Sequence, residues 1–328
     1  MRDLFDDEHD AFRASFAGFV ANEVTPNYLQ WEEEGIAPRE LYTRAGEYGF
    51  VGMAVPEEFG GGGSNDFRFN QVVAEEFAAA GVGGAGLGIT LHNDITTPYF
   101  LEVCNDEQKQ RWLPGIASGE LITAIAMTEP GTGSDLAGVA STAIRDGDEY
   151  VLNGSKTFIT NGINADLVIV VAKTDPSERH AGMSLLVVER GMPGFERGRN
   201  LDKIGMHSQD TAELFFTDVR VPATNLLGEA GKGFNYLTAN LAQERLSIAV
   251  TGVATARAAL GWTVDYVQER MAFGKPIGSF QNTKFVLAEI KTEVDMAQAY
   301  VDQCVLRLNA GTLSAADAAQ AKLACSEL

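Results

Sequence analysis

The spacing of apolar residues changes twice along the 328-residue chain, and this change limits the folds that the chain can adopt. Up to about residue 119, apolar side chains such as Phe12, Phe16 and Phe19 recur three and four positions apart, as in amphipathic helices. From Leu121 the apolar runs become short and β-rich, and after Gly233 the helical spacing returns. The sequence therefore predicts helices, then a sheet, then helices.

Three runs of β-branched and large apolar residues predict the strands of the central part. They are Val168–Ala172, Ser184–Val188 and Ala212–Phe216. The dipeptides Asn153-Gly154 and Asn161-Gly162 predict tight turns, because asparagine and glycine tolerate positive φ. The glycine-rich segment 55–64 predicts a loop within the first helical part.

Two long helices are expected after the sheet. The first ends near Arg270 and the second spans about 281–310. A last helix, capped by Ser314, runs to Leu328 with no stop signal, so we expect the sequence to end inside an element. An apolar stripe predicts that the second long helix packs on one side of a bundle; its members are Val286, Ile290, Val294, Ala297 and Val301.

These patterns predict a multidomain α+β protein. A chain of 328 residues exceeds what one hydrophobic core usually organises. We place an all-α N-terminal domain at 1–122, a middle β-domain at 123–232, and a helical bundle, incomplete at its C-terminus, at 233–328.

Composition and charge argue against several classes of function. The net charge of −20 repels phosphate backbones, so nucleic acid is not expected as a partner. Apolar runs are too short to span a bilayer, and the acidic N-terminus is unlike an export signal. Cys104, Cys304 and Cys325 lack metal-ligand spacing, so we expect no metal site and a reducing, cytoplasmic location.

One carboxylate interrupts an apolar stripe of the first long helix. The stripe steps by four, three and four residues through Leu237, Leu241, Glu244 and Ile248. Burial would raise the pKa of Glu244 toward the range in which a carboxylate acts as a base near neutral pH. The spacing is equally compatible with a domain edge where Glu244 pairs with Arg245 or Lys232.

Two segments rich in small and hydroxyl residues carry the strongest functional signal. They are Ala126–Asp135, read Ala-Met-Thr-Glu-Pro-Gly-Thr-Gly-Ser-Asp, and Ser155–Gly162, read Ser-Lys-Thr-Phe-Ile-Thr-Asn-Gly. From glycine and serine content alone, a surface turn is the preferred interpretation of the first segment. In this order, however, the segments resemble the two flavin-binding signatures of acyl-CoA dehydrogenases. The similarity continues through 211–216 and 270–277 and covers essentially the whole chain.

The resemblance implies an FAD site built from several parts of the chain. Phe158 stands where the family often has tryptophan, which keeps an aromatic wall but loses an indole donor. Arg270, Phe273 and Gln281 match positions that reach the FAD of a neighbouring subunit in a homotetramer, a dimer of dimers. The other cofactor-binding residues implied are Ile125, Met127, Thr128, Gly133, Ser134 and Thr160.

The resemblance also implies the reaction. Residues 242–246, Ala-Gln-Glu-Arg-Leu, are similar to the long-chain type, in which this helix carries the catalytic glutamate. Glu244 would abstract the α-proton of a fatty acyl-CoA while flavin N5 accepts the β-hydride, giving a trans-2-enoyl-CoA in fatty acid β-oxidation. Ser134, Tyr236 and Arg245 would contact the substrate, and an electron-transferring flavoprotein would reoxidise the flavin.

Three alternatives stay open. An isovaleryl-type enzyme for short branched acyl-CoA places its glutamate on the same helix. An acyl-CoA oxidase shares nearly every motif and differs in letting oxygen reach the reduced flavin. A non-catalytic protein that binds flavin or acyl-CoA is the third.

Overall fold

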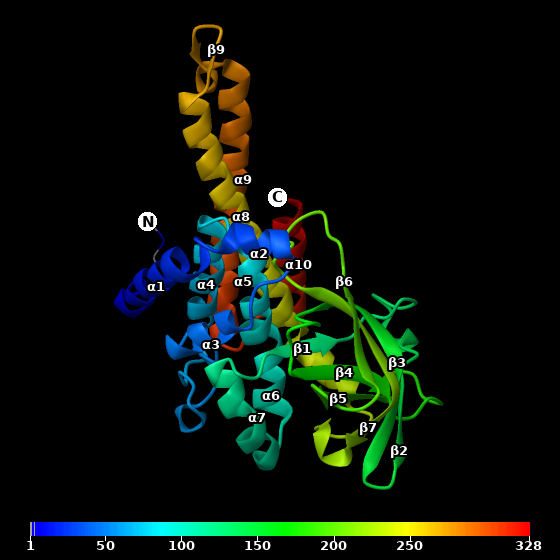
Figure 1. The fold of residues 1–328 in the computed structure, drawn as a ribbon. Helices are drawn as coiled ribbons and strands as arrows, with labels where there is room; N and C mark the ends of the chain where they lie inside the picture. Colours follow the sequence, from blue (N-terminus) through cyan, green and yellow to red (C-terminus); the bar gives the residue numbers. More distant parts are fainter. Residues whose placement is uncertain (1, 3) are drawn as a thin grey trace. The chain divides into compact units, whose positions relative to one another are not determined.

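The computed structural model describes residue 2 and residues 4–328 (Figure 1). Helices come first, a sheet follows and helices end the chain, so the predicted fold class is confirmed. The chain divides into two compact units. Unit 1 contains 1–22, 66–83 and 241–328, and unit 2 contains 23–65 and 84–240. The predicted boundaries of three domains stay a prediction.

Unit 1 is a helical bundle. Leu246, Val250 and Val253 lie on the buried face of α8, where they pack with Val301 and Val305 of α9. The spacing of these residues places them on one stripe of each helix. The elements of unit 1 are α1 (Asp7–Phe19), α4 (Phe67–Ala79), α8 (Gly233–Glu269, from Leu241 on), β9 (Met271–Ala272), β10 (Lys275–Pro276), α9 (Gln281–Asn309) and α10 (Ala315–Glu327).

The cap of the last helix is as predicted. The Ser314 hydroxyl accepts a hydrogen bond from the Asp317 backbone N–H at 3.0 Å and donates to the Asp317 carboxylate at 2.8 Å. This pairing satisfies one of the donors left free at a helix N-terminus. The predicted stripe of α9 is only half right: Val294 and Val301 are buried, whereas Val286 is 43% and Ile290 37% exposed.

The two exposed residues of that stripe belong to a longer apolar surface. We define the distal hairpin as residues 262–296, the end of α8, the β9–β10 turn and the start of α9, whose tip lies beyond the other helices of unit 1 in Figure 1. Large apolar side chains on it are mostly open to solvent. Those more than half exposed are Trp262, Tyr266, Met271, Phe273, Phe285 and Met296.

Unit 2 combines helices with a sheet. Its helices are α2 (Tyr28–Glu34), α3 (Glu40–Glu47), α5 (Gly83–Thr90), α6 (Thr97–Val103) and α7 (Asp106–Ser118), with a π-helical turn η3 (Leu91–Thr96) before α6. Its strands are β1 (Thr123–Ala126), β2 (Thr142–Asp146), β3 (Glu149–Thr160), β4 (Leu167–Lys173), β5 (Met183–Glu189), β6 (Phe195–Asn200), β7 (Thr211–Pro222) and β8 (Leu226–Leu227).

The strands form one sheet in the order β6-β7-β3-β2-β4-β5-β8, with β1 added beside β4. The pairs β1–β4 and β2–β4 are parallel, and the other pairs are antiparallel. The three strands predicted from sequence are β4, β5 and β7. The first motif of the candidate site starts at the last residue of β1, and most of the second motif lies in β3, so both are attached to this sheet.

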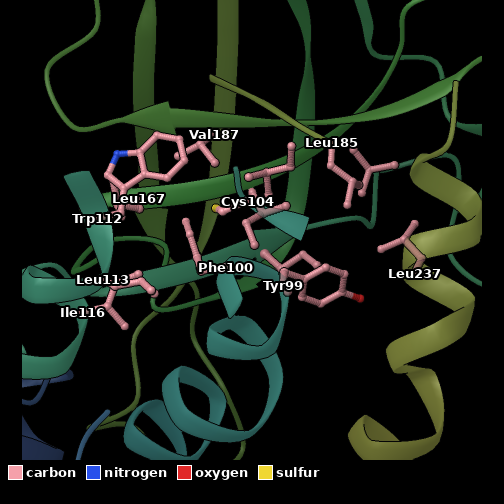
Figure 2. Packing of buried hydrophobic residues seen from close by; sticks show 14 of the residues in the cluster. Tyr99, Phe100, Cys104, Trp112, Leu113, Ile116, Leu167, Leu185, Val187 and Leu237 are labelled. Atoms are coloured by element: carbon pink, nitrogen blue, oxygen red, sulfur yellow. The ribbon is translucent and has the colours of Figure 1, made fainter. Parts of the chain in front are cut away.

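The central strands are buried on both faces. Alternate residues of a strand point to opposite sides of the sheet, so each strand contributes to two cores. On β4, Ile169 and Val171 join one core with Trp112 of α7, whereas Val168 and Val170 join a second core made almost entirely of strand residues. Figure 2 shows the first core, in which aromatic residues of α6 and α7 face β4 and β5. The helices therefore fix the strands that carry the candidate site.

One turn prediction is wrong and the other is confirmed. Asn153-Gly154 lies inside β3, where the pairing with β7 shifts between Leu152 and Gly154. Gly154 has φ +150°, and a side chain there would meet the Ser141 hydroxyl, so the glycine serves a bulge against a close neighbour. Asn161-Gly162 forms a turn, with Asn161 at φ 61°. Within residues 2 and 4–328, no helix has the length and apolar character needed to cross a membrane.

Candidate functional site

The first motif begins on β1 and leaves the sheet after Ala126. Ile125 pairs with Ile169 of β4, and it is only 8% exposed, within the core that contains Trp112. Any contact of Ile125 with a cofactor therefore falls to its backbone. Met127 and Thr128, which follow the strand, are half-buried. Their N–H groups and the Thr128 hydroxyl are polar groups that a ligand at this end of the sheet could use.

The second motif reaches the first through its backbone. The Thr157 N–H donates to the Thr128 carbonyl at 2.9 Å, which ties β3 to the residues after β1. The next residue, Phe158, lies where the pairing of β3 with β7 shifts, at φ 61°, and its ring is 68% exposed. Positive φ is rare for a bulky residue and costs free energy. The bulge thus exposes an aromatic side chain one residue after the backbone bond to Thr128.

We call the place where residues 127–129 meet residues 156–161 the junction of β1 and β3. A buried ion pair holds these two segments together. Lys156 is fully buried, and its ammonium donates to Glu129 Oε1 at 2.9 Å and to the Met127 carbonyl at 3.0 Å. Burial lowers the pKa of Lys156, and Glu129 opposes that shift. Burial also tends to raise the pKa of Glu129, but hydrogen bonds from Ser141 and Lys156 outweigh it and hold this pKa below its ordinary value.

Asn161 anchors the turn that ends the second motif. Its side-chain oxygen accepts from the Tyr42 hydroxyl at 2.9 Å and from Gln209 Nε2 at 3.0 Å. Its amide nitrogen donates to the carbonyls of Gly88 and Thr123, both at 3.1 Å. All four bonds are buried, so this side chain joins the start of β1 to the end of β3. Thr160, the half-buried last residue of β3, directly precedes Asn161.

His92, in the π-helical turn η3, lies behind β1. Its Nε2 is 3.0 Å from the Ile116 carbonyl, so Nε2 carries the proton, and Nδ1 accepts from the Thr123 hydroxyl at 2.8 Å. Burial lowers the pKa of His92 to about 4, although the Ile116 carbonyl and the charge of Asp166 oppose this. The ring is therefore neutral at physiological pH and fixes the entry to β1.

The loop after Thr128 begins with a tight turn at 129–132 and continues with exposed residues. Glu129 and Thr132 exchange two backbone hydrogen bonds of 2.9 and 3.1 Å, and the Thr132 hydroxyl donates to the Gly138 carbonyl at 3.0 Å. Gly133 and Ser134 between them are exposed. A side chain at Gly133 would meet no atom within 4 Å, so the fold itself does not require glycine there. This backbone can be approached closely by a ligand.

The residues predicted on α8 are less clearly arranged. Glu244 and Arg245 are half-buried. Ile248, predicted to share a buried stripe with Glu244, is 39% exposed, so that prediction is wrong at this position. The buried face of α8 is offset by two residues because Leu246 and Val250 pack into the bundle. The predicted rise in the pKa of Glu244 stays a prediction.

Tyr236, at the start of α8, lies in unit 2. It is half-buried and packs against the core that contains Trp112, and its hydroxyl accepts a hydrogen bond from the Glu229 N–H at 3.1 Å. The hydroxyl is therefore held at the turn that precedes α8.

Arg270, Phe273 and Gln281 lie together at the tip of the distal hairpin. The Arg270 carbonyl accepts from the Ile277 N–H at 2.8 Å, closing the β9–β10 turn. All three side chains are exposed, and Phe273 is 94% exposed at φ 52°. The Phe273 ring meets Phe280 of its own chain edge to face, at 6.1 Å between ring centroids, and is otherwise open to solvent.

Comparison with known families identifies the chain. Profiles of the acyl-CoA dehydrogenases match three consecutive parts: the N-terminal domain at residues 6–120, the middle domain at 124–219 and the C-terminal domain at 231–328. The chain belongs to the acyl-CoA dehydrogenase family. As an acyl-CoA dehydrogenase it is an oxidoreductase that acts on CH–CH groups.

Curated relatives of this acyl-CoA dehydrogenase span several substrate types. It is 46% identical over 330 residues to the mitochondrial long-chain specific acyl-CoA dehydrogenase of Sus scrofa, covering 100% of the chain and 76% of the relative. It is 34% identical over 326 residues to the mitochondrial isovaleryl-CoA dehydrogenase of Solanum tuberosum, covering 99% and 79%.

Solved structures agree with the fold. An acyl-CoA dehydrogenase from Geobacillus kaustophilus matches with a TM-score of 0.97 and 49% identity, covering 100% of this chain and 86% of the other. A glutaryl-CoA dehydrogenase from Mycobacterium smegmatis in complex with FADH2 matches with a TM-score of 0.90 and 29% identity, covering 98% and 81%.

The groups at the junction of β1 and β3 fit such a flavin. A flavin ring has flat faces that pack against aromatic rings and a polar edge that accepts hydrogen bonds. Phe158 offers an exposed ring, and Thr128 offers a hydroxyl and a peptide N–H on the neighbouring segment.

Three residues that support the junction were not predicted as part of the site. Lys156, Glu129 and Asn161 are all inside the two motifs. Each is a polar residue that the structure buries almost completely. A lysine within a strand, flanked by residues that must pack, was the available signal, since buried lysine is rare without a partner.

Proposed function

We propose that this enzyme catalyses the FAD-dependent α,β-dehydrogenation of fatty acyl-CoA to trans-2-enoyl-CoA, with Glu244 as the base. Family membership carries the reaction type, and the 46% identity to a long-chain specific enzyme supports fatty acyl chains. FAD is the expected cofactor, as in the neighbour solved with FADH2. Bound FAD supplies the acceptor for the hydride that leaves the β-carbon.

Glu244 is proposed to take the α-proton of the substrate. A thioester acidifies this proton, but a carboxylate removes it only if the enolate oxygen is stabilised by hydrogen bonds. The half-burial of Glu244 is consistent with a base that is partly shielded from water. Arg245, its half-buried neighbour, and Tyr236 and Ser134 are proposed to orient the thioester.

The flavin is proposed to lie against the junction of β1 and β3. Thr128 would donate to its polar edge, and Phe158 and Thr160 would line the ring. Gly133 and Ser134 would approach the pyrophosphate through the open loop backbone. Ile125, whose side chain is in the core, and Met127 would contribute backbone groups.

A homotetramer is proposed because the distal hairpin exposes apolar side chains that water does not favour. Arg270, Phe273 and Gln281 at its tip would then reach the FAD of another subunit, with the guanidinium paired to a diphosphate. An electron-transferring flavoprotein is the proposed acceptor. A cytoplasmic location is kept as a proposal, since Cys104, Cys304 and Cys325 are buried free thiols; cell fractionation would test it.

Reductive bleaching tests the reaction. The FAD-loaded enzyme is mixed without oxygen with saturated acyl-CoA thioesters of increasing chain length, including isovaleryl-CoA, and flavin absorbance is followed. We expect the fastest bleaching with long straight chains. Preference for isovaleryl-CoA would favour the branched short-chain alternative, absence of bleaching would favour a binding protein, and rapid reoxidation by oxygen would favour an oxidase.

The variant Glu244→Gln tests the base. It should still bind FAD, while the rate of bleaching falls by about 10³-fold, the range expected for loss of a general base. Glu327→Gln, an exposed carboxylate on α10 of the same unit and outside the distal hairpin, serves as the matched control and should bleach at the normal rate. An unchanged rate for Glu244→Gln refutes the assignment of the base.

A further inference from the structure

The ion pair of Lys156 and Glu129 joins three backbone segments beside the proposed flavin. Lys156 contacts Glu129 and the Met127 carbonyl, and the carboxylate of Glu129 also accepts from the N–H groups of Ala140 at 2.7 Å and Ser141 at 3.0 Å. The Glu129 side chain is 6% exposed and that of Lys156 is fully buried. A charged pair shielded from water exerts a stronger field on nearby groups than a surface pair does.

The ammonium acts on one particular peptide group. In a trans peptide the C=O and N–H bonds point in opposite directions. Because Lys156 holds the Met127 carbonyl, the N–H of Thr128 in the same peptide is directed away from Lys156. The following peptide is fixed as well, because the Thr128 carbonyl accepts from Thr157. The orientation of the Thr128 donor is thus set by groups of this chain.

A cation on the carbonyl also polarises that peptide. Hydrogen bonds to an ionised donor are strong, and they strengthen the next hydrogen bond in the same chain of bonds. The Thr128 N–H should therefore be a better donor to a negatively charged acceptor than an ordinary peptide N–H. The carboxylate of Glu129, bonded to the same ammonium, reduces this effect without removing it.

We propose that Lys156 is a positioning residue that orients and polarises the Met127–Thr128 peptide toward the anionic edge of reduced flavin, and that Glu129 sets the strength of this effect. The proposal rests on the proposed placement of the flavin beside Thr128. The pair then adjusts how readily the flavin is reduced, a role beyond holding the loop in place.

The midpoint potential of bound FAD, measured by dye equilibration without substrate, tests the pair. Lys156→Met removes the cation and should destabilise reduced flavin about tenfold relative to oxidised flavin, a potential lower by about 30 mV for a two-electron couple. Glu129→Gln removes the anion and should shift the potential in the opposite direction when measured at a pH low enough to keep Lys156 protonated, because Glu129 opposes the lowering of the Lys156 pKa by burial. Lys156→Arg keeps the charge and should stay near the potential of the unmodified protein.

A merely structural pair predicts a different pattern. If the pair only holds the loop, Lys156→Met and Glu129→Gln both loosen it and shift the potential in the same direction, which overturns the proposal. Arg220→Met removes an exposed cation, paired with Glu149 at 2.9 Å on the same sheet, and should leave the potential unchanged. A shift as large as that of Lys156→Met would show a general charge effect and also overturn the proposal.

Three further outcomes can be told apart. If Lys156→Met does not fold, the opposite shift of Glu129→Gln and the near-normal potential of Lys156→Arg still decide the question. If the unmodified protein bleaches with acyl-CoA while the variants show no opposite shifts, the role of the pair fails and the proposed function stands. If the unmodified protein binds FAD but never bleaches, the proposed function fails first.

Discussion

The junction of β1 and β3 buries polar side chains, whereas the distal hairpin exposes apolar ones. At the junction, polar side chains such as Lys156, Asn161 and His92 are buried, and each is hydrogen-bonded to backbone of its own unit. On the hairpin, apolar side chains such as Phe273 and Phe285 are 94% and 57% exposed. The first region is prearranged by its own chain, whereas the second exposes surface that a further protein surface would stabilise.

The difference has an energetic meaning. A buried polar group costs free energy unless it is bonded, so the junction keeps its geometry only while every partner stays in place. An exposed apolar side chain costs little in the isolated unit, but covering it releases roughly 25 cal/mol for each Å². The junction should therefore respond to changes in protonation and bonding, and the hairpin to changes in assembly.

The largest expected effect concerns pH and His92. Its pKa is lowered from 6.5 to about 4 by burial. Between these pH values His92 is therefore protonated in the unfolded chain and neutral in the folded protein. Stability from this group is complete above pH 6.5 and is lost as pH falls toward 4. At about 1.4 kcal/mol per unit the loss reaches roughly 3 kcal/mol. Urea unfolding of the FAD-loaded protein from pH 7 to pH 4 measures it.

His92→Gln provides the matched control. Glutamine keeps one donor and one acceptor but does not titrate in this range. The unfolding free energy of this variant should fall less between pH 7 and pH 4 than that of the unmodified protein, because all other groups titrate in both. Parallel pH profiles for the two proteins would mean that His92 is not the acid-sensitive group of the junction.

The sequence predicts the strands better than it predicts the polar groups. Periodicity reports which face of an element is buried, and this was enough to place β4 and β5 and the long helices. It cannot report partners distant in sequence. The bond of Asn161 to Tyr42 joins residues that periodicity does not relate, and Asn153-Gly154 looks like a turn until Ser141 is known to pack against it.

Family resemblance is limited in a similar way: it names residues that would face the cofactor and misses those that support them. Family resemblance named Phe158 and Thr128 but gave no reason for the ion pair of Lys156 and Glu129 beneath them, which depends on the three-dimensional crossing of two segments. The spacing of the stripe containing Val286 likewise predicts a buried face, although Val286 and Ile290 are exposed in this chain. Periodicity does not say which surface covers an apolar stripe.

A smaller effect is expected for Phe158. Its backbone has φ 61° and its ring is 68% exposed, so the fold bears strain and gains little packing. Phe158→Asn, a residue that accepts positive φ, should stabilise the FAD-free protein by roughly 0.5–1 kcal/mol. It should weaken FAD binding by about tenfold through loss of ring contact. Thermal unfolding of the FAD-free protein and fluorescence titration with FAD measure the two effects.

Phe158→Trp separates ring contact from backbone strain. It restores an aromatic wall at the same φ, so it should bind FAD near normally and gain no stability without FAD. A Phe158→Asn protein that is less stable without FAD would show that the ring packs within the fold, and the strain would then have no link to the cofactor.

The smallest effect on the folded unit, and the clearest contrast with His92, is expected on the hairpin. Phe285→Ser replaces a ring that is 57% exposed, so the unfolding free energy of a dissociated subunit should change by no more than about 0.5 kcal/mol. The same change should shift assembly toward smaller species, because an aromatic side chain at an interface is costly to remove. Sedimentation velocity over a range of concentrations measures the shift.

Lys284→Ser, an exposed charged neighbour on α9, is the control and should leave the sedimentation unchanged. Because assembly stabilises the folded state by mass action, the melting temperature of the unmodified protein should rise with concentration, and that rise should shrink in Phe285→Ser. If the unmodified protein sediments as a single subunit at every concentration, the hairpin is not an interface between copies. Its exposed rings would then require another partner, and the contrast with the self-sufficient junction of β1 and β3 would be sharper still.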